Sequence, residues 1–258
     1  MTASNTIVKE ISVFFPFYNE QENIERVTVK AVDVLERYGL DYEIILVDDG
    51  SRDRTAQTAD DLAAASHRIR AVHHDVNRGY GAALQSGFRN ATKKWVFYTD
   101  GDGQFDIEQL GLLLTLADKY DIVSGYRKKR RDGFMRRVNA FCWGRLVTTV
   151  LGFKCRDVDS AFKLYRREIF DQIDMKSTGA LIDAEILARA NRAGYTIGEI
   201  GVDHLPRTAG AQTGAKLKVI ARAFRELLKL RRDILAAPRQ NISGIDQEEQ
   251  NEQEQPHD

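Results

Sequence analysis

Two carboxylates, Asp100 and Asp102, stand one residue apart directly after the run Val96–Thr99. The run is apolar, β-branched and aromatic, as in a buried strand, and the Asp-Gly-Asp-Gly that follows is typical of a turn. Open α/β sheets place their ligands at the carboxyl ends of such strands. Two hard oxygen ligands without a neighbouring His or Cys suit Mg²⁺ or Mn²⁺, which also take phosphate oxygens from a substrate. Because Asp-Gly turns are common connections, the weight of this motif depends on the rest of the chain.

Two more polar segments follow expected strands. Asp48–Thr55 (DDGSRDRT) repeats the pattern of acids and a glycine turn, and Asn77–Ala83 (NRGYGAA) begins a helix with small residues. Such a helix start lets backbone N–H groups approach a phosphate or a sugar, and close packing of the helix on the sheet explains the small residues equally well. His73 and His74 are adjacent, so on a strand they point to opposite faces and cannot ligate one metal together. We therefore expect no catalytic role for them.

A basic run, Tyr126–Arg137 (YRKKRRDGFMRR), holds seven basic residues and one acid. Charged runs usually form solvated surfaces, but this one directly follows a strand that should end near the same edge of the sheet. Capture of an anionic group is therefore favoured. Further along, Asp157 and Asp159 stand before another apolar strand, within Lys154–Tyr165.

The elements that must position these residues alternate between strand and helix patterns, which indicates βαβ units and an α/β fold. The first strand is stopped by Pro16, and Asn19 can cap the helix that follows. Expected strands lie at Ile11–Phe15, Tyr42–Val47, Ile69–His74, Trp95–Thr99, Asp121–Ser124 and Tyr195–Val202, and expected helices at Thr55–Ala65, Ile107–Leu116, Val138–Leu151, Leu181–Ala193 and Lys216–Leu235.

The chain of 258 residues is long enough for one large α/β domain with a tail. Its formal net charge is +0, but residues 238–258 carry six acids against one arginine, so the preceding part is basic by about five charges. The Gln- and Glu-rich tail is predicted to be disordered. Cys142 and Cys155 form no Cys-x-x-Cys pair, so we expect reduced, buried thiols in a cytoplasmic protein rather than a disulfide framework or a zinc site.

Membrane contact is predicted only at the surface. No apolar run reaches the roughly 20 residues needed to span a bilayer, and the N-terminus lacks the apolar core of a secretory signal. In the stretch Lys216–Leu235, leucine, isoleucine and phenylalanine residues share one face and lysine and arginine residues surround it. This pattern predicts a helix that packs on the domain and also lies on anionic lipid.

Six motifs then follow one another in a specific order: FFPFYNE, VDDGSRDRT, NRGYGAALQSGF, TDGDGQF, DVDSAFKLYRR and HLPRTAGAQTGA. Over roughly residues 10–230 the chain resembles the family 2 glycosyltransferases, and among them the group similar to dolichol-phosphate mannose synthase and bacterial polyprenyl-phosphate glycosyltransferases. The resemblance implies a GT-A type fold: a nucleotide-binding, Rossmann-like, mostly parallel sheet with helices on both faces. We accordingly divide the chain into an arm (1–9), a GT-A domain (10–215), a basic amphipathic helix (216–237) and the tail (238–258).

The resemblance also implies roles for the residues at matching positions. Nucleotide-sugar binding falls to Pro16, Tyr18, Glu20, Val47, Asp49, Gly101 and Gln104, the metal to Asp100, Asp102 and Gln104, and the acceptor phosphate to Arg127, Arg137 and Arg207. The implied catalytic set is Asp100, Asp102, Asp157, Arg127 and Arg207, and Gly210 matches the same acceptor loop as Arg207. Two departures stand out: Ala161 occupies a position where relatives have Gly, and Gln212-Thr213 replaces their Ser-Lys, with Lys216 further on.

The implied reaction is metal-dependent, inverting transfer of a sugar from a nucleotide-diphosphate sugar (GDP-mannose or UDP-glucose type) to polyprenyl or dolichyl phosphate. A lipid phosphate is already an anionic nucleophile, so no general base is needed. We expect this reaction at the cytoplasmic membrane face, with peripheral contact through Lys216–Leu235. The resemblance also allows for an integral-membrane partner protein. Mg²⁺ or Mn²⁺ is the implied cofactor.

Three other functions are weighed against this one. A sugar hydroxyl acceptor in polysaccharide or glycolipid synthesis would need a carboxylate base, with Asp157 first and Asp159 or Glu185 behind it. A non-catalytic nucleic-acid-binding protein is disfavoured because no stripe of stacking aromatic residues accompanies the basic segments, so no nucleic acid is expected. A sugar nucleotidyltransferase is disfavoured because no Gly-rich, Lys-containing loop lies between Ile11 and Asn23.

Overall fold

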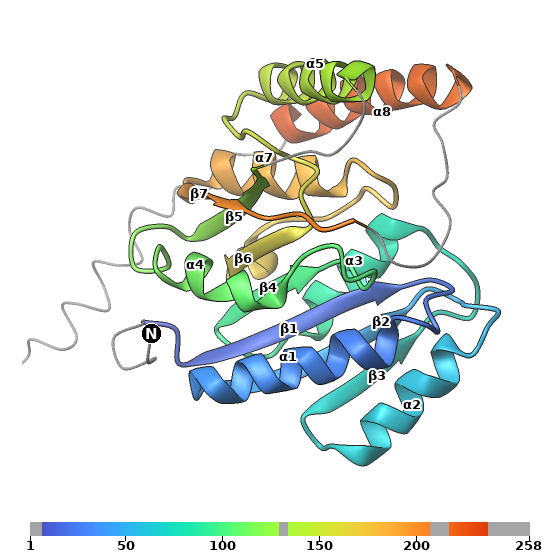
Figure 1. Ribbon diagram of the computed structural model, residues 1–258. Coiled ribbons are helices and arrows are strands. Elements are labelled where there is room, and N and C mark those ends of the chain that lie inside the picture. Colours follow the sequence, from blue (N-terminus) through green and yellow to red (C-terminus); the bar gives the residue numbers. More distant parts are fainter. Residues whose placement is uncertain (1–6, 129–133, 207–216, 237–258) are drawn as a thin grey trace, which may run out of the picture.

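The computed structural model describes residues 7–128, 134–206 and 217–236 (Figure 1). A seven-stranded sheet with strand order β3-β2-β1-β4-β6-β5-β7 forms its centre. The strands are β1 (Glu10–Phe17), β2 (Asp41–Asp48), β3 (Ile69–His73), β4 (Trp95–Thr99), β5 (Ile122–Arg127), β6 (Phe162–Arg166) and β7 (Ile197–Val202). The helices are α1 (Ile24–Tyr38), α2 (Thr55–Ala65), α3 (Tyr80–Asn90), η2 (Ile107–Gln109), α4 (Leu110–Leu114), α5 (Phe134–Leu151), α6 (Ile169–Gln172), α7 (Ile182–Ala193) and α8 (Leu217–Ala236). The predicted disordered tail lies outside the described residues.

The sheet is mostly parallel, as predicted. Strands β1, β2, β3 and β4 run in one direction, β5 and β7 are parallel to each other, and β6 is antiparallel to both of its neighbours. Phe17 pairs with Asp48 in the register of β1 and β2, and Phe14 pairs with Tyr98 in that of β1 and β4. The carboxyl ends of β1, β2 and β4 therefore meet at one edge of the sheet.

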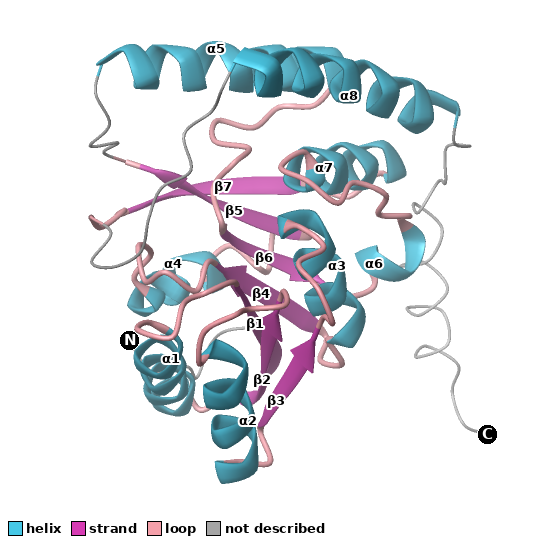
Figure 2. Cartoon of the chain, turned by 90° about the vertical axis from the view of Figure 1, so that its right-hand side faces the viewer, coloured by secondary structure: helices cyan, strands magenta, loops and turns pink. Residues whose placement is uncertain are grey.

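Helices cover both faces of the sheet, which confirms the predicted α/β architecture. In Figure 2, α1, α2 and α4 lie on one face, and α3, α6 and α7 lie on the other. Both views place α5 and α8 side by side beyond α7, near the β7 end of the sheet. Within the described ranges, no helix is long and apolar enough to cross a membrane.

A cluster of aromatic rings fills the space between the sheet and α3. The Phe88 ring lies 4.8 Å from that of Phe14 and 3.9 Å from that of Phe170, measured between centroids. A Cβ atom at Gly87 would lie 2.2 Å from the Phe14 ring, so the glycine is needed for this close approach of α3 to the sheet. The cluster fixes α3, and with it the helix start at Tyr80, against the central strands.

Four local predictions were wrong. Pro16 does not stop the first strand, because β1 continues through it to Phe17, and the missing N–H falls near the end of the strand, where it costs at most one hydrogen bond. Asn19 does not cap a helix: its φ is 54°, its side chain accepts the Arg52 N–H at 2.8 Å, and α1 begins only at Ile24. This asparagine instead joins the loops after β1 and β2. The helix predicted from Ile107 to Leu116 divides into the short elements η2 and α4. Cys142 is exposed rather than buried.

Candidate functional site

A pocket of about 280 Å³ lies where β1, β2 and β4 end. It is lined by Pro16, Phe17, Tyr18, Glu20, Asp49, Asn77, Gly79, Tyr80, Ala83, Asp100, Gly101 and Asp102. The structure thus brings together seven of the residues that the sequence assigned to the nucleotide sugar and the metal. Val47 and Gln104 are not among the lining residues. Val47 is fully buried in β2, and the Gln104 amide donates to the Leu205 carbonyl at 3.3 Å.

The acidic pair at the end of β4 has the electrostatics of a cation site. Burial, and then the neighbouring charge of Asp102, raise the pKa of Asp100 to about 7, although a hydrogen bond from the Tyr80 hydroxyl (3.1 Å) opposes the shift. Two carboxylates so close together repel each other, and a bound cation removes that repulsion. The described residues contain no group of three or more His, Cys, Asp or Glu side chains that could hold a metal. Diphosphate oxygens and water would have to complete the coordination, as is usual for Mg²⁺.

Glycines shape the walls of the pocket. A Cβ atom at Gly101 would lie 2.2 Å from the Phe17 ring, so the turn between the two acids can pack on β1 only without a side chain. Gly79 lines the pocket with a φ of 97°. Gly81 donates its N–H to the Thr178 carbonyl at 2.9 Å, and a Cβ there would lie 2.5 Å from the Ser177 carbonyl. A Cβ at Gly79 would in turn lie 2.8 Å from the Thr178 carbonyl oxygen, so both glycines allow the start of α3 to pack closely on the segment 177–179, and Gly79 lines the pocket as well.

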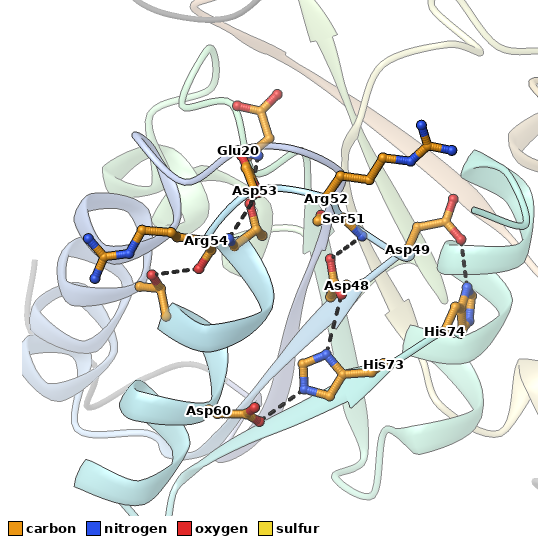
Figure 3. A network of polar contacts seen from close by, with 12 residues as sticks. Glu20, Asp48, Asp49, Ser51, Arg52, Asp53, Arg54, Asp60, His73 and His74 are labelled. Atoms are coloured by element: carbon orange, nitrogen blue, oxygen red, sulfur yellow. Dashed lines mark hydrogen bonds and ion pairs between the residues drawn. The ribbon is translucent and has the colours of Figure 1, made fainter. Parts of the chain in front are cut away.

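The two histidines of the 69–74 strand region hold the acids that end β2 (Figure 3). His74 Nδ1 lies 2.6 Å from Asp49 Oδ1, and His73 Nδ1 lies 3.3 Å from Asp48 Oδ2. The predicted opposite orientation of the histidines is confirmed. Asp49 also accepts the backbone N–H groups of Arg78 and Gly79, both at 2.9 Å. Asp49 therefore positions the loop that lines the pocket, a role that the sequence did not reveal.

A second concavity, which we call the basic groove, lies beside the end of β5. Its volume is about 1040 Å³. It is lined by Tyr126, Arg127, Lys128, Ala140, Phe141, Gly144, Arg145, Thr148, Thr149, Phe153, Lys154, Cys155, Arg156, Asp157, Val158, Asp159 and Glu199. Asp157 binds Arg127 with both oxygens: Nε and Nη2 of the guanidinium each lie 2.7 Å from a carboxylate oxygen. This bidentate pair joins β5 to the loop before β6.

The other two candidate bases are placed differently. Asp159 is exposed and lines the basic groove. Glu185 is fully buried on α7, where it accepts the backbone N–H groups of Lys176 and Ser177 and pairs with Arg189. Its contacts are those of a structural residue.

The predicted acceptor loop falls largely outside the described residues. Arg207, Gly210, Gln212, Thr213 and Lys216 lie there, as does the side chain of Arg137. The chain that leads to the loop is described: Leu205 donates its N–H to the Gln104 carbonyl at 2.7 Å, and His204 forms a bridge with Phe105. The segment after β7 therefore runs beside the acidic turn of β4.

Sequence reasoning missed a polar network behind the acidic pair. Tyr98, Lys163 and Asp183 are buried and contact one another, and Tyr80 bonds Asp100. The only signal in the sequence was a lysine within the apolar run Ala161–Tyr165, because its partner lies on a distant helix.

The fold and the pocket define an α/β protein of the nucleotide-binding class, with its ligand site at the carboxyl ends of central strands. The model of the family "Glycosyl transferase family 2" matches residues 12–174. The chain therefore belongs to glycosyl transferase family 2, as the six motifs predicted.

Known proteins similar to this chain agree with that assignment. Glycosyltransferase AglD of Haloferax volcanii is 33% identical over 212 residues, which cover 77% of this chain and 33% of AglD. The chain thus spans about a third of the length of this relative. The crystal structure of glucosyl-3-phosphoglycerate synthase from Mycobacterium tuberculosis with Mn²⁺ and UDP-glucose has a TM-score of 0.65 at 18% identity, covering 89% of this chain and 80% of that one. The complex of the same enzyme with Mg²⁺ and UDP has a TM-score of 0.62 at 18% identity and covers the same shares of both chains. The predicted GT-A fold is confirmed.

The acidic pair makes cation binding pH-dependent. Asp100 must lose its proton to bind a cation, and its pKa of about 7 means that the proton is held below neutral pH. We expect the affinity for Mn²⁺, measured from the free-ion signal in electron paramagnetic resonance, to fall by up to about tenfold per pH unit below pH 7 and to level off above it.

The variant Tyr80→Phe checks the cause of this dependence. It removes a hydrogen bond that lowers the pKa of Asp100, so the pH at which the Mn²⁺ affinity begins to fall should move upward. Tyr38→Phe, on α1 and away from the pocket, should leave it in place. A pH-independent affinity, or equal midpoints in all three proteins, would contradict this assignment of Asp100.

Proposed function

We propose that this glycosyltransferase moves a sugar from a nucleotide-diphosphate sugar, of the GDP-mannose or UDP-glucose type, to a polyprenyl or dolichyl phosphate. The observation that carries the proposal is the composition of the basic groove. Five cationic side chains line it against three acidic ones, together with the apolar residues Ala140, Phe141, Phe153 and Val158. Such a mixed lining suits an anionic head group attached to an apolar chain better than a neutral sugar.

The donor side follows from the pocket at the end of β4. Asp100 and Asp102 would hold Mg²⁺ or Mn²⁺, and the glycine-walled pocket leaves space for the nucleotide. A bound divalent cation would supply the positive charge that stabilises the departing diphosphate. The structurally similar M. tuberculosis enzyme, crystallised with Mn²⁺ and UDP-glucose and with Mg²⁺ and UDP, supports this interpretation.

The residues on the acceptor side suit a phosphate nucleophile. An oxygen of the lipid phosphate would attack the anomeric carbon, while the bond from that carbon to the diphosphate breaks and its electrons stay with the diphosphate. A single displacement of this kind inverts the anomeric configuration. No proton has to be removed, which agrees with Asp157 being engaged by Arg127 rather than placed as a base. The excess of cationic side chains in the basic groove would offset the repulsion between two anions.

A panel of nucleotide sugars tests this function. Each donor is incubated with Mg²⁺ or Mn²⁺ and with either polyprenyl phosphate or a neutral glycolipid, and labelled sugar is measured in the lipid fraction. We expect transfer to the phosphate only, reduced at least about 100-fold by Arg127→Met. Lys30→Met, which breaks a partly exposed ion pair between α1 and Asp106, should retain full activity. Transfer to the neutral acceptor alone, blocked by Asp159→Asn, would replace the proposal with the hydroxyl-acceptor reaction.

We also propose peripheral docking at the cytoplasmic membrane face through α8. Three leucines and isoleucines of this helix (Leu227, Leu230 and Ile234) are buried against the domain, whereas Phe224, Leu228 and Leu235 are exposed. Exposed cations accompany them on the same helix: Arg225, Lys229, Arg231 and Arg232. The predicted apolar face thus divides into a packed part and a part available to lipid, which anionic head groups would reinforce.

Sedimentation with liposomes tests the docking. Binding to the vesicles should require anionic lipid, because the cations of α8 contribute to the attraction. Leu228→Glu should weaken vesicle binding several-fold. Val29→Glu is the matched control, since Val29 is a similarly exposed apolar residue on α1. Equal sedimentation with neutral and anionic vesicles, or equal losses in both variants, would count against a membrane role for α8.

A further inference from the structure

A lysine is buried in the middle of the sheet, on the strand that separates the two cavities. Lys163 lies on β6 between β4 and β5, and its side chain has no solvent exposure. Its ammonium lies 2.8 Å from Asp183 Oδ1, at the start of α7. A buried charge is costly unless it is paired and fully hydrogen-bonded. The hydrogen-bond partners of the Lys163 ammonium therefore indicate its role.

Those partners are mostly backbone atoms of one loop. Besides Asp183, the ammonium donates to the carbonyl of Val158 at 3.0 Å and to that of Ser160. The Tyr98 hydroxyl oxygen is a further, longer acceptor, so the three protons of the ammonium are fully engaged. Tyr98 donates its hydroxyl to Asp183 and lies 3.3 Å from the ammonium. Lys163 thus fixes the backbone of the loop 157–160 from inside the sheet.

The loop held in this way carries groups of the basic groove. Asp157, which binds Arg127, and Asp159 both belong to it, and Val158 lines the groove as well. On its other side the network reaches the donor pocket, because Tyr98 stands two residues before Asp100 on the same chain segment. Lys163 therefore lies between the pocket for the nucleotide and the groove for the acceptor.

We infer that Lys163 is a positioning residue for the acceptor side, which sets the loop 157–160 relative to the acidic turn of β4. This inference deepens the proposed function and rests on it for the identity of the acceptor. The lysine touches no substrate in this account. It acts through the backbone carbonyls that it holds, and displacement of a positioned group by about 1 Å can cost on the order of 100-fold in rate.

The test is the neutral pair Lys163→Met/Asp183→Asn, which removes both charges and leaves an amide oxygen to accept the Tyr98 hydroxyl. We expect the KM for polyprenyl phosphate to rise and kcat to fall, together by about 10- to 100-fold in kcat/KM. The dissociation constant of the nucleoside diphosphate in Mn²⁺ should stay within about twofold, because no pocket residue is changed. Amide hydrogen exchange across 157–161 should become at least about tenfold faster. The matched control is Glu43→Gln/Arg70→Met, which neutralises an ion pair between β2 and β3.

Three results would overturn the inference: unchanged acceptor kinetics in the folded double variant, a loss confined to nucleotide binding, or equal effects in the control. If this double variant does not fold, Lys163→Gln/Asp183→Asn takes its place, since it leaves no unpaired buried charge and the glutamine amide can donate to a carbonyl. A smaller loss in acceptor kinetics, again without a loss in nucleotide binding, is then expected. Hydrogen exchange separates this inference from the proposed function. If the parent protein transfers nothing to polyprenyl phosphate, faster exchange at 157–161 still supports the role of Lys163, and unchanged exchange refutes it.

Discussion

The repulsion between two carboxylates at the end of β4 is the constraint on which the rest of the site depends. Asp100 and Asp102 are held one residue apart by a turn that packs against Phe17, and Gly101 makes that packing possible. The turn holds the pair in place, and burial, followed by the charge of Asp102, raises the pKa of Asp100 to about 7. A rigid pair of this kind is complementary to a cation, because the structure has already brought the charges together before the cation binds.

The same edge of the sheet separates two kinds of charge. The pocket at the acidic pair is built from β1, β2, β4 and the start of α3, and its carboxylates suit a cation. The basic groove is built around the end of β5 and α5, and its arginines and lysines outnumber its acidic side chains. The antiparallel strand β6 lies between β4 and β5, so the two halves are joined through the one strand that carries a buried lysine. In the proposed transfer, the acidic pair would serve the donor, and the excess of cations in the basic groove would serve an anionic acceptor.

Much of this could be predicted from the sequence. Strand and helix periodicity located the seven-stranded core, and the motif order led to the family and to most of the pocket. The failures have physical causes. Asn19 has the residue type of a helix cap, but its side chain finds a better partner in a loop 33 residues away. The roles of Val47 and Gln104 stay predictions, since the direction of each side chain depends on packing that no local pattern shows. His74 and Lys163 act through partners brought near by the fold alone, Asp49 and Asp183, so no spacing in the sequence could reveal them.

The most direct test of the central claim is the effect of Mn²⁺ on nucleoside diphosphate binding, measured by titration calorimetry with UDP and GDP. In the parent protein the metal should strengthen binding of the preferred nucleotide at least about tenfold, because a cation held by the acidic pair would offset the negative charge of the diphosphate. Asp102→Asn should abolish this enhancement and leave metal-free binding nearly unchanged. If the enhancement persists in that variant, the cation is held elsewhere and the account of the β4 acids is wrong.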